Sequence, residues 1–322
     1  MALSWEMKQA RTGEDNIMHT RPYVGVDWGT SRMRAMLIEE EGQAPDRDHV
    51  VYGDGIAKLD RPIADVLLSA IEPWTDKHGK LDIVMAGMVG SNIGWRETRY
   101  LPCPASLADL TDQAERFEQC GHCMAILPGV RCTNPMGQPD LMRGEELQML
   151  GWLAANAGVS QADRLYCLPG THTKWCRMDG GRLEFFNTSL TGELFAMLKE
   201  HSILVPKDDV IFAKPFEKDT FLKGVDVILD QPSALLHSLF STRTRKLVQG
   251  EAAGDGPSYL SGLLIGSCVQ NAFDLYGIPA AGVELVGDPS LCRKYAHAIE
   301  RMGQSCRILD GVDAVHAGFL AL

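Results

Sequence analysis

A carboxylate, a glycine and two hydroxyl side chains stand close together in Asp27-Trp28-Gly29-Thr30-Ser31, at the end of the first apolar segment. Glycine lets the backbone approach a ligand closely, and the amide and hydroxyl groups of such a turn can donate to phosphate oxygens. The carboxylate of Asp27 can hold Mg²⁺ directly or through water, because Mg²⁺ takes few protein oxygens. The motif predicts phosphate binding at Gly29, Thr30 and Ser31 and a metal ligand at Asp27. The alternative is a plain hairpin whose polar side chains satisfy their own turn.

A second turn of this type spans residues 169–174. Its glycine and donors predict a second phosphate site, and the candidates are Gly170, Thr171, His172, Thr173 and Lys174. Lys174 could neutralise a β- or γ-phosphate, or lie along the surface with its stem on apolar groups. The sequence contains no Gly-x-x-x-x-Gly-Lys-Ser/Thr segment, so nucleotide binding would need a fold other than that of the P-loop proteins.

Two adjacent carboxylates, Glu145 and Glu146, follow Gly144 at the start of a segment with helical spacing. Phosphoryl transfer requires a metal ligand, phosphate donors and a group that accepts the proton of the attacking hydroxyl. Glu145 is the candidate for this catalytic base, with Glu146 and Asp27 as competitors. The alternative for either glutamate is an ordinary first-turn acid that complements the helix dipole, and this suits Glu146 better.

The composition is that of an ordinary globular protein, with 322 residues, 45% hydrophobic and 23% charged. A net charge of -11 argues against nucleic acid or an acidic membrane as partner. No apolar run approaches the roughly 20 residues that span a bilayer. Nine scattered cysteines favour a reducing, cytoplasmic location over a disulfide framework, and we expect Cys120 and Cys123 to have no catalytic part. A homo-oligomer is compatible with the sequence.

Apolar strands alternate with helical segments in both halves of the chain, which indicates an α/β fold. The sequence predicts a polar tail at residues 1–20. A cluster of Pro, Gly, Asn and Gln at 133–139 suggests a boundary between a lobe at 21–138 and a second lobe at 139–322. We expect helices at 63–72, 144–155, 233–247, 257–276, 290–302 and 314–322, and strands at 23–27, 34–38, 81–86, 124–127, 164–168, 283–287 and 307–309.

The order of these motifs resembles that of the superfamily of actin, hexokinase and the heat-shock chaperones. Residues 27–31 are similar to its first phosphate loop, 144–151 to the segment that opens the second domain of glycerol-kinase-like enzymes, and 170–173 to the second phosphate loop. The resemblance implies two actin-like (ribonuclease H-like) lobes with ATP and Mg²⁺ between them. It also implies adenosine binding near Gly287 and Asp288. The chain departs from glycerol kinases in carrying Glu145 where they carry aspartate.

A narrower resemblance covers the chain from about Pro22 to the C-terminus. Gly-Met-Val-Gly-Ser at 87–91, Met-Arg-Gly-Glu-Glu at 142–146, Pro-Gly-Thr-His-Thr-Lys-Trp at 169–175 and Thr-Gly-Glu-Leu-Phe at 191–195 are similar to the 2-dehydro-3-deoxygalactonokinases. That family implies phosphoryl transfer from MgATP to the C6 hydroxyl of 2-dehydro-3-deoxygalactonate, a step of galactonate breakdown that feeds an aldolase.

A sugar-acid substrate carries a carboxylate, for which arginine offers a matching fork of donors. The substrate candidates that follow from the resemblance are Arg32, Gly90, Ser91, Trp95, Arg96, Arg143 and Glu193. A kinase of the same fold acting on another sugar or sugar acid is the nearest alternative, because fold does not fix substrate. Two further alternatives are a non-catalytic sugar sensor and a thiol oxidoreductase using Cys120 and Cys123.

Overall fold

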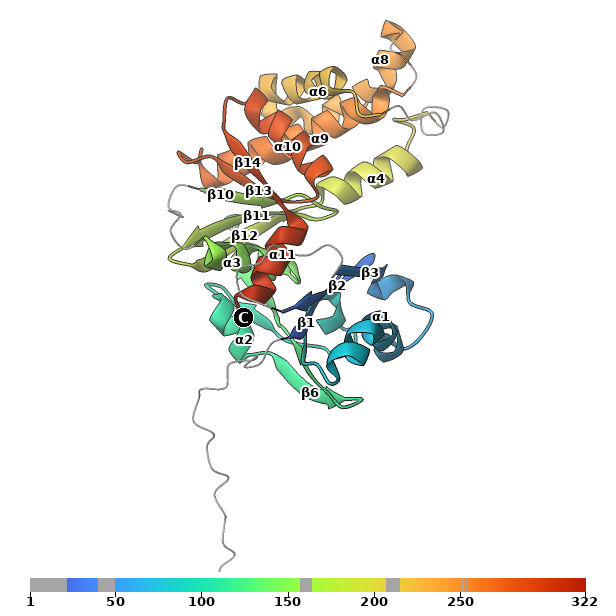
Figure 1. The fold of residues 1–322 in the computed structure, drawn as a ribbon. Helices are drawn as coiled ribbons and strands as arrows, with labels where there is room; N and C mark the ends of the chain where they lie inside the picture. Colours follow the sequence, from blue (N-terminus) through green and yellow to red (C-terminus); the bar gives the residue numbers. More distant parts are fainter. Residues whose placement is uncertain (1–21, 40–49, 157–163, 207–214, 251, 253) are drawn as a thin grey trace, which may run out of the picture.

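The computed structural model describes residues 22–39, 50–156, 164–206, 215–250, 252 and 254–322. Two lobes, each built on one sheet, lie one above the other in Figure 1. Strands and helices alternate along both, so the predicted α/β class is confirmed. No helix in the described ranges is both long and apolar enough to cross a bilayer.

The first sheet has the strand order β3-β2-β1-β4-β7-β6. β1 pairs antiparallel with β2, as the hairpin motif predicts, while β4 and β7 run parallel to β1. The carboxyl ends of β1, β4 and β7 therefore meet at one edge of the sheet. The helix α1 (Ile63–His78) packs its apolar side on one face through Leu67 and Ile71. The strands are β1 Tyr23–Trp28, β2 Arg32–Ile38, β3 Val50–Asp54, β4 Ile83–Gly87, β6 Glu115–Gln119 and β7 His122–Ile126.

The second sheet repeats this topology in the order β12-β11-β10-β13-β14. β10 and β11 form a hairpin like β1 and β2, and β13 and β14 run parallel to β10 as β4 and β7 run parallel to β1. The amino-acid sequence shows no such repeat. The order of strands in the two sheets can stay the same although the side chains of the two halves have diverged. The strands are β10 Leu165–Leu168, β11 Thr173–Asp179, β12 Arg182–Ser189, β13 Val283–Gly287 and β14 Cys306–Asp310.

Helices cover the outer face of the second sheet, and two helices lie between the sheets. α6 (Lys218–Asp230), α9 (Gly256–Tyr276) and α10 (Pro289–Arg301) enclose one apolar core with β10, β11 and β13, and α4 (Thr191–His201) packs beside α9. α3 (Glu145–Ala155) and α11 (Gly311–Leu320) cross between the lobes (Figure 1). A Cβ built on Gly151 would lie 2.0 Å from the Cα of Gly318, so this crossing requires glycine.

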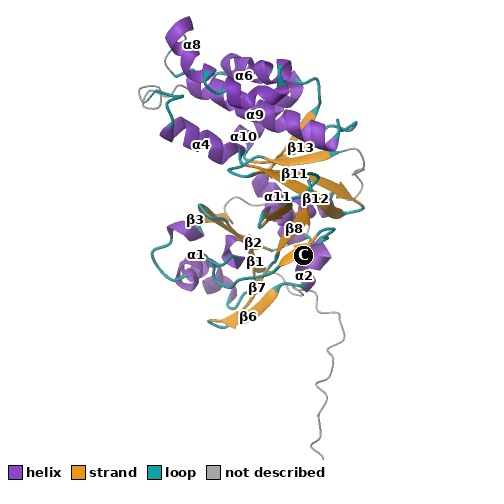
Figure 2. Cartoon of the chain, turned by 180° about the vertical axis from the view of Figure 1, so that it is seen from behind, coloured by secondary structure: helices purple, strands orange, loops and turns teal. Residues whose placement is uncertain are grey.

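A small sheet of order β5-β8-β9 joins the lobes on the side of α2 (Leu107–Asp112). Its strands are β5 Tyr100–Pro102, β8 Gly129–Thr133 and β9 Pro139–Met142. Figure 2 shows β8 below β12, and its inner face shares a core with the second sheet. The cluster at 133–139, where the sequence suggests a domain boundary, forms the turn between β8 and β9.

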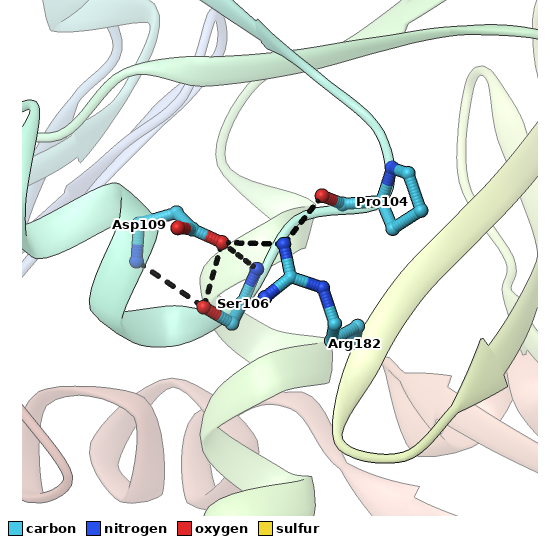
Figure 3. A network of polar contacts seen from close by, with 4 residues as sticks. All are labelled: Pro104, Ser106, Asp109 and Arg182. Carbon is cyan, nitrogen blue, oxygen red and sulfur yellow. Dashed lines mark hydrogen bonds and ion pairs between the residues drawn. The ribbon is translucent and has the colours of Figure 1, made fainter.

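A polar network ties α2 to the β12 strand of the second lobe (Figure 3). The guanidinium of Arg182 donates to the carbonyl of Pro104 at 2.7 Å and to the carboxylate of Asp109 at 2.9 Å. The same carboxylate accepts from Ser106, which caps α2. Ala105 and Leu183 add a bridge of two backbone hydrogen bonds. The lobes are thus fastened to each other along this side.

The expected helix at 233–247 is wrong, because the segment is broken into three pieces. A 3₁₀ turn at Pro232–Ala234 precedes α7 (Leu235–Ser238), and α8 spans Ser241–Gln249. The hydroxyl of Ser241 binds the carbonyl of Ser238 at 2.5 Å and the hydroxyl of Tyr259 at 2.8 Å. Such side-chain bonds to nearby backbone compete with helical hydrogen bonding. Two further 3₁₀ turns lie at Ile56–Lys58 and Met88–Gly90.

Candidate active site

The first predicted phosphate turn, residues 29–31, is held from behind by the segment after β3. The amide of Ile56 donates to the carbonyl of Gly29 at 3.1 Å, and the amide of Ala57 donates to that of Thr30 at 3.1 Å. Thr30 and Ser31 are exposed at the carboxyl end of β1. These backbone hydrogen bonds therefore hold the turn in place, while the hydroxyl side chains of Thr30 and Ser31 stay accessible.

Asp27 lies beside this turn at the end of β1 and is 9% exposed. It forms an ion pair with Arg34 on the neighbouring strand. Gly144 packs directly on this strand end, since a Cβ built on it would lie 3.2 Å from the Cα of Gly87 and 3.9 Å from Oδ1 of Asp27. Gly144 also has φ +109°, which L side chains rarely adopt. This glycine therefore brings the start of α3 against Asp27.

Glu145, the first residue of α3, comes close to both Asp27 and Lys174. Burial raises the pKa of its carboxyl above the ordinary value, the ammonium of Lys174 acts in the opposite direction, and the charge of Asp27 raises it further. The charges of Lys174 on the second hairpin and Asp27 on the first thus both act on Glu145. A carboxylate here, between two predicted phosphate turns, can accept a proton.

Glu146 is turned away from solvent and is only 1% exposed. Both of its carboxyl oxygens accept from the amide of Gly144, at 2.8 and 2.7 Å. Burial, with a smaller contribution from Glu145, raises the pKa of Glu146 to about 8. Glu146 therefore holds the turn at Gly144, rather than acting as an ordinary ionised acid of the first helical turn.

The second predicted phosphate turn, residues 170–173, is held by the start of α4. The amide of Glu193 donates to the carbonyl of Thr171 at 3.0 Å, and a Cβ on Gly192 would collide with the carbonyl oxygen of Gly170 at 2.4 Å. Glu193 also binds the ring of His172, so it belongs to this turn. Thr173 is fully buried with its hydroxyl 2.7 Å from that of Tyr295, while Thr171 and His172 are exposed.

Lys174 is turned away from the exposed face of this loop. Its side chain is buried on β11, and Nζ donates to the carbonyl of Leu141 at 2.9 Å and to the hydroxyl of Thr188 at 2.7 Å. Neighbouring strand residues point to opposite faces, so Lys174 and Thr173 diverge. The charge of Lys174 acts on Glu145, but its ammonium is engaged with the oxygens of Leu141 and Thr188.

The predicted substrate arginines do not converge. The guanidinium of Arg143 is buried on the Tyr100 ring and binds Thr98 through two of its nitrogens. Arg96 lies over Phe117 and near Glu115. Both of these residues belong to β6, which is three strands away from β1, or about 14 Å at the usual spacing between strands.

The remaining substrate candidates lie along the first lobe. Arg32 is exposed at the start of β2, without a side-chain partner among the described residues. Gly90 packs against Arg143, Ser91 bonds its own turn at 2.7 Å, and Trp95 stacks edge-on with Phe117 at 5.4 Å.

The predicted adenosine residues lie at the carboxyl end of β13, next to the second phosphate turn. Gly287 has φ +151°, and a Cβ built on it would lie 3.5 Å from the carbonyl oxygen of Pro169. The carboxylate of Asp288 caps α10 by accepting from the amides of Ser290 and Leu291, both at 2.9 Å. The hydrogen bond from Ser290 is the main reason why the pKa of Asp288 lies below its ordinary value.

Known proteins similar to this chain show the family to which it belongs. The model of the 2-keto-3-deoxy-galactonokinase family matches residues 27–322. The chain belongs to this family. A probable 2-dehydro-3-deoxygalactonokinase of Rhizobium meliloti is 36% identical over 304 residues, which are 93% of this chain and 95% of that protein. The 2-dehydro-3-deoxygalactonokinase of Escherichia coli is 32% identical and covers 94% of this chain and 98% of its own length. The chain is therefore that of a sugar-acid kinase, as the sequence motifs predict.

Solved structures agree with this family assignment. The crystal structure of a 2-dehydro-3-deoxygalactonokinase protein from Sinorhizobium meliloti has a TM-score of 0.81 at 34% identity, covering 92% of this chain and 96% of that one. An activator of 2-hydroxyisocaproyl-CoA dehydratase from Clostridium difficile, solved with bound ADPNP, has a TM-score of 0.50 at 10% identity and covers 93% of each chain. The second likeness concerns the fold alone. Together they confirm the predicted actin-like fold of this kinase.

Three further polar residues, which the sequence motifs do not single out, lie near Lys174 or on the small sheet. Asp140 and Thr188 lie beside Lys174, and Arg131 projects from the outer face of the small sheet. Arg131 follows an apolar residue in a short strand, which is a weak signal. Asp140 and Thr188 carry no local signal, because they meet only when β9 packs beside β12.

Proposed function

We propose that the protein transfers the γ-phosphoryl group of ATP to the C6 hydroxyl of 2-dehydro-3-deoxygalactonate. The observation that carries this proposal is the packing of Gly144 on Asp27, which sets Glu145 where the charges of Asp27 and Lys174 both act on it, in a chain of the 2-keto-3-deoxy-galactonokinase family. The substrate is that named for the relatives from Rhizobium meliloti and Escherichia coli. The turns at 29–31 and 170–173 would bind the phosphates, and the strand end at Gly287 and Asp288 would accept the adenosine.

The carboxylates present fit Mg²⁺ as the accompanying ion. No group of three or more metal-binding side chains occurs in the described part of the chain, whereas Asp27 and Glu145 lie near each other. Mg²⁺ usually keeps several waters and uses one or two carboxylates with the substrate phosphates. In this proposal Asp27 would hold the ion, which would supply positive charge next to the transferred group, and Glu145 accepts the proton of the C6 hydroxyl.

Purified protein with MgATP should phosphorylate 2-dehydro-3-deoxygalactonate much faster than glycerol or glucose. The measurement is ATP consumption across a panel of 2-keto-3-deoxy acids and neutral sugars, with the product isolated to locate the phosphate. A higher kcat/KM for glucose would contradict the substrate, although it would leave the kinase assignment intact. Phosphate on a hydroxyl other than C6 would correct the position of transfer.

We further propose that Arg131 binds the carboxylate of the sugar acid. A cavity of about 520 Å³ lies along the small sheet and is lined by Tyr100, Arg131, Asp140 and Leu141 among others. The guanidinium of Arg131 has no side-chain or backbone partner among the described residues. The carboxylate and the C6 hydroxyl are at opposite ends of the substrate, so an arginine beside the phosphate turn, such as Arg32, is poorly placed for it.

Arg131→Gln should raise KM for the sugar acid about tenfold to a hundredfold, because a charge-assisted hydrogen bond contributes about 1.5–3 kcal/mol. KM for ATP should stay within twofold of the parent value. Arg32→Gln is the matched variant, and we expect it to affect ATP rather than the acid. Steady-state kinetics with each substrate varied in turn measures both. The reverse pattern would assign the carboxylate to Arg32.

A further inference from the structure

A lysine that is buried and bonded to protein oxygens calls for another explanation than phosphate binding. Lys174 is 5% exposed, and Nζ lies 2.9 Å from the carbonyl oxygen of Leu141 and 2.7 Å from the hydroxyl of Thr188. An ammonium group has three hydrogens, so two are engaged by these oxygens. One hydrogen of the Lys174 ammonium is therefore left for a further acceptor.

The hydroxyl of Thr188 links this ammonium to a carboxylate. It accepts from Lys174 and donates to Oδ1 of Asp140 at 2.6 Å, while the amide of Thr188 donates to Oδ2 of Asp140 at 2.8 Å. A buried charge is tolerated when it is paired and hydrogen-bonded. Lys174, Thr188 and Asp140 thus form a compensated network, called here the lysine network.

The lysine network fixes the strand that leads into the catalytic helix. Asp140 and Leu141 lie on β9, whose last residue, Met142, is three positions before Glu145. Lys174 and Thr188 belong to β11 and β12 of the second lobe. The network therefore sets the position of β9, and with it the start of α3, relative to the second phosphate turn.

We propose that the lysine network is a positioning device that holds Glu145 in place for proton acceptance, and that Lys174 does not bind a phosphate of ATP. This rests on the proposed function, in which Glu145 is the base.

The test replaces Lys174 by a neutral side chain of similar length. Lys174→Met should lower kcat about tenfold to a hundredfold, since small displacements of a catalytic group have effects of this size. The dissociation constant of a non-hydrolysable ATP analogue, measured by calorimetry, should stay within twofold. Lys223→Met, at an exposed lysine of α6, is the matched control and should change neither quantity. Weaker binding of the analogue with kcat retained would overturn the proposal, as would no change in either.

Thr188→Val removes the hydroxyl that links Lys174 to Asp140 but keeps the charge of Lys174. This variant tests the proposal if Lys174→Met fails to fold. The same fall in kcat with unchanged analogue binding supports the proposal, and an unaffected kcat overturns it. The double variant should be no slower than Lys174→Met alone, because both changes break one network. Full additivity in kcat would contradict this. Failure of the proposed function itself is seen separately, as a parent enzyme that phosphorylates no sugar acid.

Discussion

Glu145→Gln should lower kcat by about 10²–10⁴-fold while ATP binding changes little, which is the size of a general-base contribution. Glutamine keeps the length of the side chain and one acceptor oxygen, but it cannot take up a proton. The nucleotide is held in our proposal by the two glycine turns and the end of β13, so its affinity should not depend on this charge. Single-turnover kinetics at saturating ATP and sugar acid, with calorimetry of an ATP analogue, measures both quantities.

The neighbouring glutamate provides an unusually close control. Glu146 is buried, its pKa is raised to about 8, and both oxygens face the amide of Gly144. At neutral pH glutamine resembles the protonated acid, so Glu146→Gln should change kcat much less than Glu145→Gln. If Glu146→Gln is the more damaging change, the base has been assigned one residue too early. Near-full activity of Glu145→Gln would remove Glu145 from the reaction.

The pH dependence should follow the same residue. Burial is the main reason why the pKa of Glu145 lies above that of an ordinary glutamate, and Asp27 adds to it. A base must be ionised to act, so activity should be lost as the pH falls through this raised pKa. The acid limb of kcat/KM should therefore lie at a higher pH than an exposed glutamate would give, and it should be absent from the residual activity of Glu145→Gln.

Local patterns in the sequence are sufficient to predict the hairpin at Asp27 and the helix start at Glu145. Both depend on neighbours within a few residues, namely a strand ending in a glycine turn and a glycine before an apolar helix. The family resemblance then supplies the order of the motifs. No local pattern gives the distance in space between the Asp27 turn and the start of α3. Gly144 reaches Asp27 only because α3 packs on the ends of β1 and β4.

Lys174 shows that a motif does not give the direction of each side chain. The sequence groups Lys174 with the possible phosphate donors of residues 170–174, whereas β11 begins at Thr173. Alternation along a strand then sends Lys174 to the face that carries Thr188 and β9. Likewise, Arg143 lies within a family motif, yet its guanidinium is occupied by Thr98 and Tyr100. Proximity in sequence to a functional loop does not determine which way a long side chain points.

Asp27→Asn should produce the second large loss, with a different signature from that of Glu145. The amide keeps the shape of the side chain and can still accept a hydrogen bond from Arg34, but it lacks the charge that favours Mg²⁺. Loss of several kcal/mol of charge stabilisation corresponds to a fall in kcat of about 10²–10³-fold. The Mg²⁺ concentration for half-maximal rate should rise at the same time.

The appropriate comparison for Asp27 is an exposed carboxylate close to the same turn. Asp54 ends β3, pairs in register with Arg32 and is exposed, so Asp54→Asn removes an equal charge from the same neighbourhood. We expect Asp54→Asn to keep the parent Mg²⁺ dependence, whereas Asp27→Asn shifts it. Equal shifts in the two variants would mean that the ion responds to the general negative potential of the turn. A parent-like Mg²⁺ titration for Asp27→Asn, with kcat lowered, would instead make Asp27 a partner of Arg34 alone, and the metal would have to be held by Glu145 and the phosphates.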